Sequence, residues 1–212
     1  VHMKPDKKGL LIVISGPSGV GKGTVRKALF EREGQDLVYS ISMTTRTPRN
    51  GEQDGIDYYF VSHDEFEHQI ERGNLLEYAK FVGNYYGTPY DKVEEQLNQG
   101  HEVVLEIDVQ GAMQVKAKKP EAVFIFIAPP SFKSLEERLR HRGTETEEVI
   151  KERLVKAERE INQAAAYDYI VVNDDVDNAA DRVMAIIRAE HARCSRSLEE
   201  YYRLMKGNEQ YE

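Results

Sequence analysis

The chain has 212 residues, a formal net charge of −8 and a single cysteine, Cys194. This length fits one domain with inserted segments, and it buries enough surface to fold without disulfides or a structural metal. The negative charge argues against a protein that coats nucleic acid. The longest apolar runs, Leu10–Ile14 and Ala122–Ala128, are far shorter than the roughly 18 residues of a membrane span, so no membrane partner is expected. One cysteine allows no intramolecular disulfide, which favours a cytoplasmic protein.

Strand and helix patterns alternate along the chain, which is typical of an α/β fold with a parallel sheet. The continuous apolar run Leu10–Ser15 predicts a strand buried on both faces, and a helix is expected from Thr24 to about Glu33. The segment from Val176 to about Tyr202 predicts one long final helix. Further strands are expected at Glu102–Asp108, Val123–Ala128 and Tyr169–Val172.

A glycine-rich turn lies between the first strand and the first helix. It reads Gly16-Pro17-Ser18-Gly19-Val20-Gly21-Lys22-Gly23-Thr24, which has the spacing of a P-loop. Glycines let backbone N–H groups surround phosphate oxygens, and the following helix directs its positive end at the anion. Lys22 is expected to reach the β- and γ-phosphates of ATP. Gly23 stands where the general motif has Ser or Thr, so we expect Thr24 to contact Mg²⁺ mainly through water.

Two other regions differ from the strand–helix alternation. Residues 40–99 are rich in Tyr, Gly and Asn, with short β-like pieces at Tyr58–Val61 and Leu75–Val82 and an expected turn at Asn84–Gly87. The stretch Arg138–Arg153 is nearly all charged around Gly143, so we expect it outside the core, as a mobile lid. The sequence therefore predicts one domain over residues 3–212, with a core of 3–39, 100–137 and 160–212, an insert at about 40–99 and a lid at about 138–159.

Several short segments carry a resemblance to a known family. They are Ser40–Arg49, Gly55–Phe60, Glu77, Gly83–Pro89, Ile127–Ser131, Arg142–Glu145 and Val172–Asp174. Their order and spacing, together with the P-loop, resemble the guanylate kinases over almost the whole chain. The resemblance implies a P-loop NTPase fold, a parallel sheet core flanked by helices, an inserted mixed α/β GMP-binding subdomain and a helical lid. It also implies direct transfer of the terminal phosphate of ATP to GMP with Mg²⁺ as cofactor.

The resemblance assigns four residues to the phosphate of GMP, namely Arg46, Arg49, Tyr58 and Tyr86. Their chemistry fits, because guanidinium groups pair bidentately with phosphate oxygens and phenols add neutral donors. The catalytic set implied by the resemblance consists of Lys22, Arg46, Arg138, Arg142 and Arg153.

The guanine base is assigned in the same way to Glu77, Ser42 and Thr88. One carboxylate can accept both N1–H and the 2-amino group of guanine, whereas adenine has an acceptor at N1 and would leave the charge unpaired. Asp108 resembles an acid that contacts substrate or Mg²⁺-bound water, and Glu106 is a weaker candidate. A capping role for Asp108 remains the alternative.

The arginines around Gly143 have two interpretations. A charged stretch is usually a solvated pair of helices. The resemblance instead implies that Arg138, Arg142 and Arg153 close over the transferring phosphate and stabilise its charge. It also implies that Arg138, Arg142 and Asn173 contact the adenine of ATP.

Other side chains are expected to be structural or exposed. His191 and Cys194 are expected on the surface, and Tyr201 and Tyr202 are expected to pack the last helix onto the body. The lysines expected at a solvated helix end are Lys116, Lys118 and Lys119.

Two other functions remain open at this stage. One is a nucleoside monophosphate kinase with a different acceptor base, against which Glu77, Ser42 and Thr88 argue. The other is a non-catalytic guanylate-kinase-like binding module, against which the complete P-loop argues. The expected partners are ATP, GMP and dGMP, and the sequence is compatible with a monomer or a homodimer.

Overall fold

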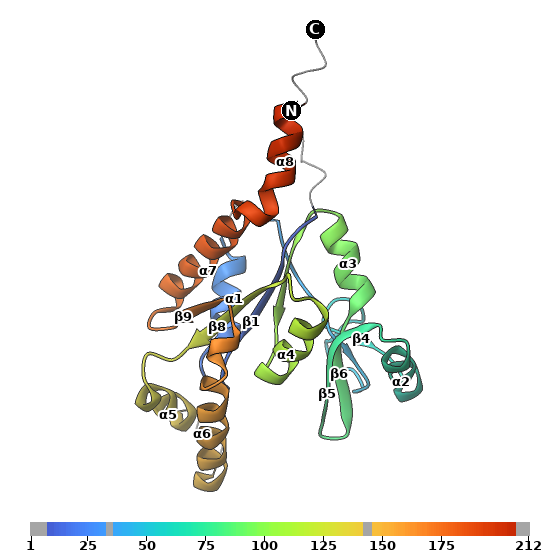
Figure 1. Cartoon of the computed structure of the whole chain (residues 1–212). Helices are drawn as coiled ribbons and strands as arrows, with labels where there is room; N and C mark the ends of the chain where they lie inside the picture. The colour runs from blue at the N-terminus through green and yellow to red at the C-terminus, as the bar shows by residue number, and fades with distance from the viewer. Residues whose placement is uncertain (1–7, 33–35, 142–145, 207–212) are drawn as a thin grey trace.

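The larger of two sheets forms the centre of the molecule (Figure 1). The computed structural model describes residues 8–32, 36–141 and 146–206. The strands of this sheet are β1 (Leu11–Ser15), β2 (Leu37–Tyr39), β7 (Glu102–Glu106), β8 (Val123–Ala128) and β9 (Tyr169–Val172). Their order is β2-β7-β1-β8-β9, and every neighbouring pair is parallel. The predicted parallel sheet is confirmed, and the ends of the predicted strands differ from the observed ones by at most two residues.

Helices cover both faces of this sheet. They include α1 (Lys22–Phe30), α3 (Tyr90–Asn98), α4 (Val109–Lys118) and α7 (Val176–His191). Successive strand residues point to opposite sides, so Ile12 and Ile14 pack in one buried cluster with side chains of α1 and α7. Leu11 and Val13 pack on the other face with side chains of α3 and α4. Burial on both faces explains why β1 is a continuous apolar run rather than an alternating one.

The smaller sheet comes from the middle of the chain. Its strands are β3 (Met43–Thr44), β4 (Tyr59–Phe60), β5 (Leu75–Phe81) and β6 (Asn84–Pro89), in the order β4-β3-β6-β5. Helix α2 (His63–Glu71) packs on it, with the rings of Phe66 and Tyr85 stacked at 5.1 Å between centroids. These elements lie inside residues 40–99. In contrast, α3 at the end of that range packs on the larger sheet through Val93 and Leu97, and the limits of the insert stay a prediction.

The prediction of a turn at Asn84–Gly87 is wrong. These residues belong to β6, and β5 and β6 are joined at Val82 and Gly83, whose φ angles are 46° and 79°. Positive φ at both central residues suits the right-handed twist of a two-residue hairpin. Gly83 adopts this conformation easily, and its position in the turn leaves Asn84 free to pair with Phe81 across the hairpin.

Two helices carry the charged stretch that was expected outside the core. They are α5 (Phe132–His141) and α6 (Glu147–Ile161), and Arg142 with its neighbours up to residue 145 lies outside the described residues. Within the stretch, Leu139 and Ile150 are buried, and Leu139 belongs to the main core cluster. The expectation that the whole stretch lies outside the core is therefore wrong, because Leu139 packs in the main core cluster.

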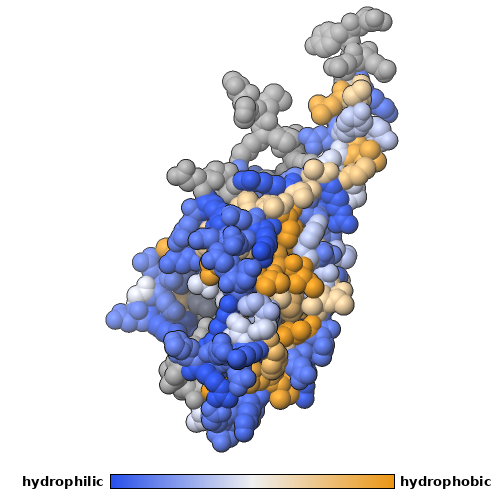
Figure 2. Space-filling model, turned by 90° about the vertical axis from the view of Figure 1, so that its left-hand side faces the viewer, coloured by the Kyte–Doolittle hydropathy of each residue, from blue (hydrophilic) through white to orange (hydrophobic). Residues whose placement is uncertain are grey.

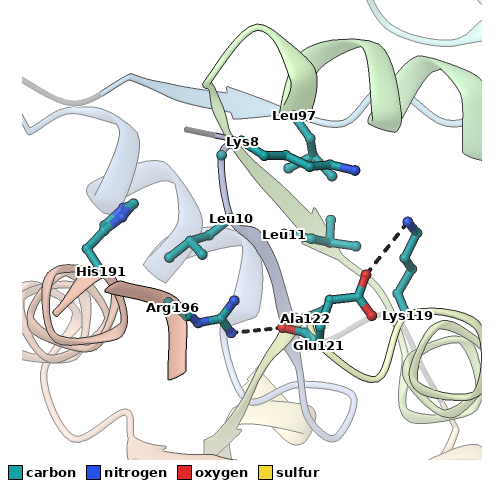
Figure 3. A pocket seen from close by; sticks show the side chains of 10 residues that line it. Lys8, Leu10, Leu11, Leu97, Lys119, Glu121, Ala122, His191 and Arg196 are labelled. Atoms are coloured by element: carbon teal, nitrogen blue, oxygen red, sulfur yellow. Dashed lines mark hydrogen bonds and ion pairs between the residues drawn. The ribbon is translucent and has the colours of Figure 1, made fainter. Parts of the chain in front are cut away.

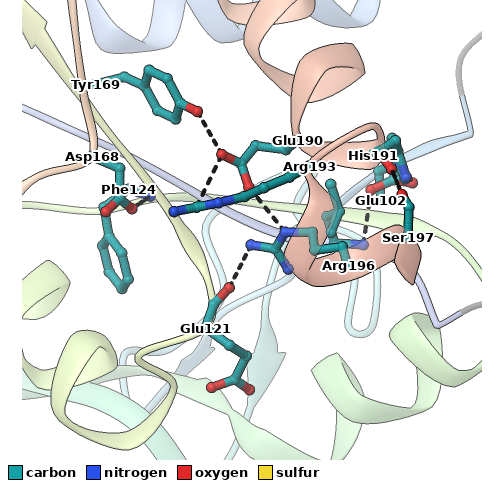
Figure 4. A network of polar contacts seen from close by, with 11 residues as sticks. Glu102, Glu121, Phe124, Asp168, Tyr169, Glu190, His191, Arg193, Arg196 and Ser197 are labelled. Carbon is teal, nitrogen blue, oxygen red and sulfur yellow. Dashed lines mark hydrogen bonds and ion pairs between the residues drawn. The ribbon is translucent and has the colours of Figure 1, made fainter. Parts of the chain in front are cut away.

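The prediction of a single long helix at the end of the chain is also wrong. It is interrupted after His191, and α8 (Cys194–Lys206) follows. Figure 4 shows the polar network at this junction, where buried Glu190 accepts from Arg196 Nε at 2.9 Å and from Tyr169 OH at 2.5 Å. Ser197 Oγ donates to the carbonyl of His191 at 2.6 Å. These contacts stabilise a bend that local helix propensity does not reveal.

Helix α8 projects away from the rest of the protein (Figure 1). None of its described residues is buried, and Figure 2 shows hydrophobic side chains on its surface. Tyr201 and Tyr202 are 55% and 54% exposed, so the expectation that they pack the helix onto the body is wrong. In the described part of the chain, no helix is both long and apolar enough to cross a bilayer.

Candidate active site

The glycine-rich loop leaves β1 and leads into α1, as its sequence predicts. Gly16 and Gly21 have φ angles of 146° and 90°. A Cβ at Gly16 would lie 2.3 Å from the carbonyl oxygen of Ile127, and one at Gly21 would lie 2.7 Å from Asn173 Nδ2. Gly21 caps α1 without a side-chain hydrogen bond, which leaves the first N–H groups of the helix available to an anion.

Lys22 folds back across this loop. Its Nζ donates to the carbonyl oxygens of Gly16 and Pro17 at 2.7 and 3.1 Å. Burial lowers the pKa of Lys22, and the nearby carboxylate of Glu106 partly opposes this effect. The ammonium group is thus held at the loop, and the helix end and the ammonium together attract phosphate groups.

Side chains whose oxygen atoms can bind a metal ion lie beside the loop. Thr24 is exposed and its Oγ1 donates to the carbonyl of Gly21 at 3.0 Å. A Cβ at Gly23 would lie 3.5 Å from Glu106 Oε1, so the carboxylate stands close to the place where the general motif has a hydroxyl. Hydroxyl and carboxylate oxygens are ligands that Mg²⁺ accepts. Among the described residues no group of three or more His, Cys, Asp or Glu side chains could hold a metal, so Mg²⁺ would depend on nucleotide phosphates and water for most of its ligands.

Side chains from α5, α6 and the end of β9 contact the loop. Arg138 donates to the carbonyls of Val20 and Asn173 at 3.1 and 2.9 Å, and Arg153 Nη2 donates to Ser18 Oγ at 2.7 Å. Buried Asn173 donates from Nδ2 to the carbonyl of Val20 at 2.8 Å. The structure therefore brings Arg138, Arg153 and Asn173 to the phosphate loop, whereas their contacts with adenine or a transferring phosphate stay predictions.

The acceptor carboxylate Glu77 is buried between the smaller sheet and α4. Thr88, paired with it across the β5–β6 hairpin, donates from Oγ1 to Glu77 Oε1 at 2.7 Å. Burial raises the pKa of Glu77 from 4.5 to about 7, the bond from Thr88 opposes the rise, and the charge of Asp108 adds to it. A carboxylate with so few partners is suited to accept further hydrogen-bond donors.

Asp108 lies between the two groups of residues. It caps α4, since its Oδ1 accepts from the N–H of Gly111 at 2.8 Å. A Cβ at Gly111 would lie 3.1 Å from Glu77 Oε2 and 3.3 Å from Asp108 Oδ1. The Asp108 charge adds to the rise in the pKa of Glu77, and it opposes a small part of the lowering of the pKa of Lys22 that burial causes. The capping contact expected as an alternative is thus present, and the same carboxylate lies beside Gly111 together with Glu77.

The residues assigned to the acceptor phosphate gather on the smaller sheet and its loops. The Arg46 guanidinium carbon lies 5.4 Å from the ring centroid of Tyr58, and the rings of Tyr58 and Tyr86 are 6.2 Å apart. Ser42 accepts a backbone hydrogen bond from Tyr59 in the same region. Arg49 is exposed nearby on the loop.

The model of the guanylate kinase family matches residues 8–190. The chain belongs to the guanylate kinase family. It is 56% identical to the guanylate kinase of Onion yellows phytoplasma (strain OY-M) over 207 residues, which cover 97% of this chain and 98% of that protein. It is also 56% identical to the guanylate kinase of Bacillus cereus (strain ZK / E33L) over 201 residues, covering 95% and 98% of the two chains. The crystal structure of guanylate kinase from Anaplasma phagocytophilum has a TM-score of 0.70 at 38% identity, with 93% and 95% of the two chains covered.

The family assignment confirms the expected fold, a helix-flanked parallel sheet with a P-loop. One partner of Arg46, the side chain of Glu52, was not identified from the sequence. Glu52 pairs with Arg46 through both of its carboxylate oxygens, at 2.9 and 3.0 Å. An acid close in sequence to two arginines was the only available signal, and it does not by itself distinguish a partner from a solvated charge.

The lysines expected at a solvated helix end do lie at the end of α4, and Lys118 is exposed, but the expectation is wrong for Lys119, which is buried. Lys118 Nζ donates to the carbonyl of Leu75 at 2.6 Å and joins α4 to β5. Lys119 is 9% exposed and its Nζ lies 2.6 Å from Glu94 Oε1 of α3. Lys116 Nζ donates to the carbonyl of Ala166. Helix α4, which carries Asp108 at its start, is therefore anchored on several sides.

A separate cavity of about 270 Å³ is lined by none of the residues that the sequence assigns to the site (Figure 3). It lies beside the start of β1 and is lined by Lys8, Leu10, Leu97 and Arg196 among others. Its basic side chains have protein partners, since Lys8 pairs with Glu94 and Arg196 with Glu190. His191, at its edge, lies 2.8 Å from Glu102 and is partly exposed, and Cys194 is exposed as expected.

Proposed function

We infer that this enzyme transfers the terminal phosphoryl group of ATP to GMP, giving ADP and GDP. The observation that carries the inference is the buried carboxylate of Glu77, which accepts from Thr88 and lies against Gly111 at the start of α4, the helix that Asp108 caps. A buried carboxylate suited to the two guanine donors and a phosphate loop that holds Lys22 thus occur in the same chain. The family assignment supports the same reaction.

We propose that ATP binds at the phosphate loop. The N–H groups at the start of α1 surround its phosphate oxygens, and the ammonium of Lys22 follows the charge of the γ-phosphate. Arg138 and Arg153, already in contact with the loop, neutralise charge on the transferring group, and Arg142 shares this role. Asn173 is assigned to the adenine.

We propose that GMP binds between the smaller sheet and α4. Glu77 accepts N1–H and the 2-amino group of guanine, and the hydroxyls of Ser42 and Thr88 serve O6 and N7. The phosphate is held by Arg46, Arg49, Tyr58 and Tyr86. Asp108 is placed to contact the bound nucleotide or a water beside it. None of these assignments uses the ribose 2′-hydroxyl, so dGMP is proposed as a second acceptor.

The proposed chemical step is a direct in-line displacement. An oxygen of the GMP phosphate forms a bond to the γ-phosphorus while the bond from that phosphorus to the β–γ bridging oxygen breaks, and ADP leaves with the electron pair. The GMP phosphate has a second pKa of about 6, so it is mostly dianionic at neutral pH and needs no general base. Bound Mg²⁺ supplies neutralisation of phosphate charge, and Thr24 would hold it mainly through water. Closure of the arginine-bearing helices would exclude water and prevent hydrolysis of ATP.

The reaction is tested by following the γ-phosphate. With ATP labelled at that position and unlabelled GMP, we expect the label in GDP and little in inorganic phosphate. Label mainly in inorganic phosphate would contradict productive transfer. A folded protein that binds GMP without any turnover would instead favour the binding-module alternative. A cytoplasmic location and a monomeric or homodimeric state stay predictions.

A further inference from the structure

Glu52 forms a two-pronged contact with Arg46. Its Oε2 accepts from Arg46 Nη1 at 3.0 Å and its Oε1 accepts from Nη2 at 2.9 Å. The same Oε2 also accepts from the backbone N–H of Arg49 at 2.7 Å. Both side chains of the pair are partly exposed, with 14% and 20% exposure for Arg46 and Glu52. One carboxylate therefore links the two arginines that are assigned to the GMP phosphate.

The contact leaves a defined part of Arg46 for a ligand. Nη1 donates to Glu52 and to the carbonyl of Thr47 at 2.8 Å, and Nη2 donates to Glu52. Glu52 thus holds the end of the guanidinium group. The N–H groups not used in these bonds are the one on Nε and the second one on Nη2, which lie on the same side of the guanidinium group. That side presents a fork of parallel donors, which is the arrangement that binds phosphate oxygens bidentately.

The turn from Arg49 to Glu52 is closed by two hydrogen bonds. The N–H of Glu52 donates to the carbonyl of Arg49 at 3.1 Å, and the N–H of Arg49 donates to the Glu52 side chain. The Arg46 guanidinium also lies over the rings of Tyr58 and Phe60, at 5.4 and 5.8 Å from their centroids. Glu52 thus holds the end of the Arg46 guanidinium group, and the rings of Tyr58 and Phe60 flank it. Removal of the Glu52 charge would weaken the contact at that end.

We propose that Glu52 is a positioning residue for the acceptor phosphate, which orients the Arg46 guanidinium before GMP binds. The proposal rests on the proposed role of Arg46 in binding that phosphate. A long side chain that is already ordered loses little conformational freedom on binding, so its hydrogen bonds contribute more of their energy to affinity. The opposite possibility is that Glu52 competes with GMP for Arg46, and then removing its charge would tighten GMP binding.

The test compares GMP with guanosine, which has the base and ribose but lacks the phosphate. In Glu52→Gln the amide can accept from Arg46 at only one oxygen and places its own donors against the other nitrogen. We expect KM for GMP to rise about tenfold, which corresponds to about 1.4 kcal/mol. We expect kcat and KM for ATP to change by less than about threefold, because the phosphate loop is untouched. The inhibition constant of guanosine is expected to stay within about twofold, since the contacts to the base remain.

The matched control is Glu71→Gln, an acid-to-amide change at an exposed position at the end of α2. It is expected to alter none of these constants. An unchanged or lower KM for GMP in Glu52→Gln would overturn the positioning role. Equal weakening of GMP and guanosine would also overturn it, because the effect would then be a general distortion of the acceptor region.

Arg46→Met separates this inference from the function it rests on. If Arg46→Met weakens GMP but not guanosine while Glu52→Gln weakens neither, the positioning role alone fails. If Arg46→Met weakens neither, the assignment of Arg46 to the phosphate fails. In the double variant, Glu52→Gln should add little to the effect of Arg46→Met, since the two residues act through one contact.

Discussion

Replacement of Glu77 by Gln should reduce activity with GMP and increase stability at the same time. The carboxylate is 8% exposed and accepts from Thr88, and guanine would add two further donors. The amide introduced by Glu77→Gln can still accept one donor, but its N–H₂ group opposes the other. Guanine would lose one charge-assisted hydrogen bond and would face an unpaired donor of the variant side chain, which together weaken binding of the transition state by about 3 to 4 kcal/mol. We therefore expect kcat/KM for GMP to fall by about 10²- to 10³-fold.

The stability change follows from the pKa of Glu77, which is about 7 in the folded protein against a usual 4.5. An acid with a raised folded pKa binds its proton more tightly when folded, so stability falls as pH rises from 4.5 to about 7 and stays lower above that pH. The rise corresponds to about 3 kcal/mol at most. Gln cannot ionise and keeps an acceptor for Thr88, so we expect a gain of about 1 to 3 kcal/mol at pH 8.

The assay pairs initial rates with thermal unfolding of wild type and Glu77→Gln at pH 5 and pH 8. The variant should have a Tm several degrees higher at pH 8, a smaller difference at pH 5, and a kcat/KM ratio of GMP to AMP reduced by about 10²-fold or more. Undiminished activity with GMP would refute the assignment of Glu77 to the base. A variant that is less stable at pH 8 would refute the account of a buried, poorly paired charge.

Three further changes probe the same site. Since Glu77 must be ionised to accept both guanine donors, kcat/KM for GMP should rise with pH and level off only above about 7. Glu77→Gln should keep only the rise near about pH 6 that ionisation of the GMP phosphate causes, and profiles of the same shape in both proteins would contradict this role of Glu77. Lys22→Ala should lower kcat by about 10²-fold or more while Tm and GMP affinity stay close to wild type, as measured by stopped assays and titration calorimetry. Gly111→Ala places a Cβ 3.1 Å from Glu77 Oε2 and should raise KM for GMP but not for ATP, and equal changes in both would argue against a local effect.

The larger sheet and the phosphate loop could be predicted because their signals are local. Burial on both faces makes Leu11–Ile14 apolar throughout, and the loop needs glycine at Gly16 and Gly21 for close approach of backbone and side chains. Each of these requirements is expressed within a few consecutive residues. The fold class followed from their alternation with helical patterns.

The contacts that complete the site are not local and were not predictable. Glu77 and Thr88 meet only because the β5–β6 hairpin pairs them, and the hairpin turns at Val82 and Gly83 rather than at the segment that follows. Glu52 is only six residues from Arg46, but it reaches that side chain because the chain turns back between Arg49 and Glu52. Charge and turn propensity along the sequence do not specify that Glu77 meets Thr88 or that Glu52 meets Arg46.

The end of the chain shows a conflict between local and tertiary preferences. Residues around Ala192 have good helix propensity, which favours one continuous helix. The helix nevertheless bends there, where Arg196 reaches Glu190 and the carbonyl of Glu121 at 2.9 and 2.8 Å. Tertiary hydrogen bonds to buried groups outweigh a propensity difference of a few tenths of a kcal/mol per residue, roughly the spread among ordinary helix-forming residues.

The most direct test of the central claim is ADP release with ATP and Mg²⁺ when GMP, AMP, CMP, UMP and dTMP are offered separately. The account predicts strong turnover with GMP and turnover lower by about 10²-fold or more with each of the others, because only guanine presents two adjacent donors to Glu77. Comparable or faster turnover with another nucleotide would contradict the assignment of the acceptor site.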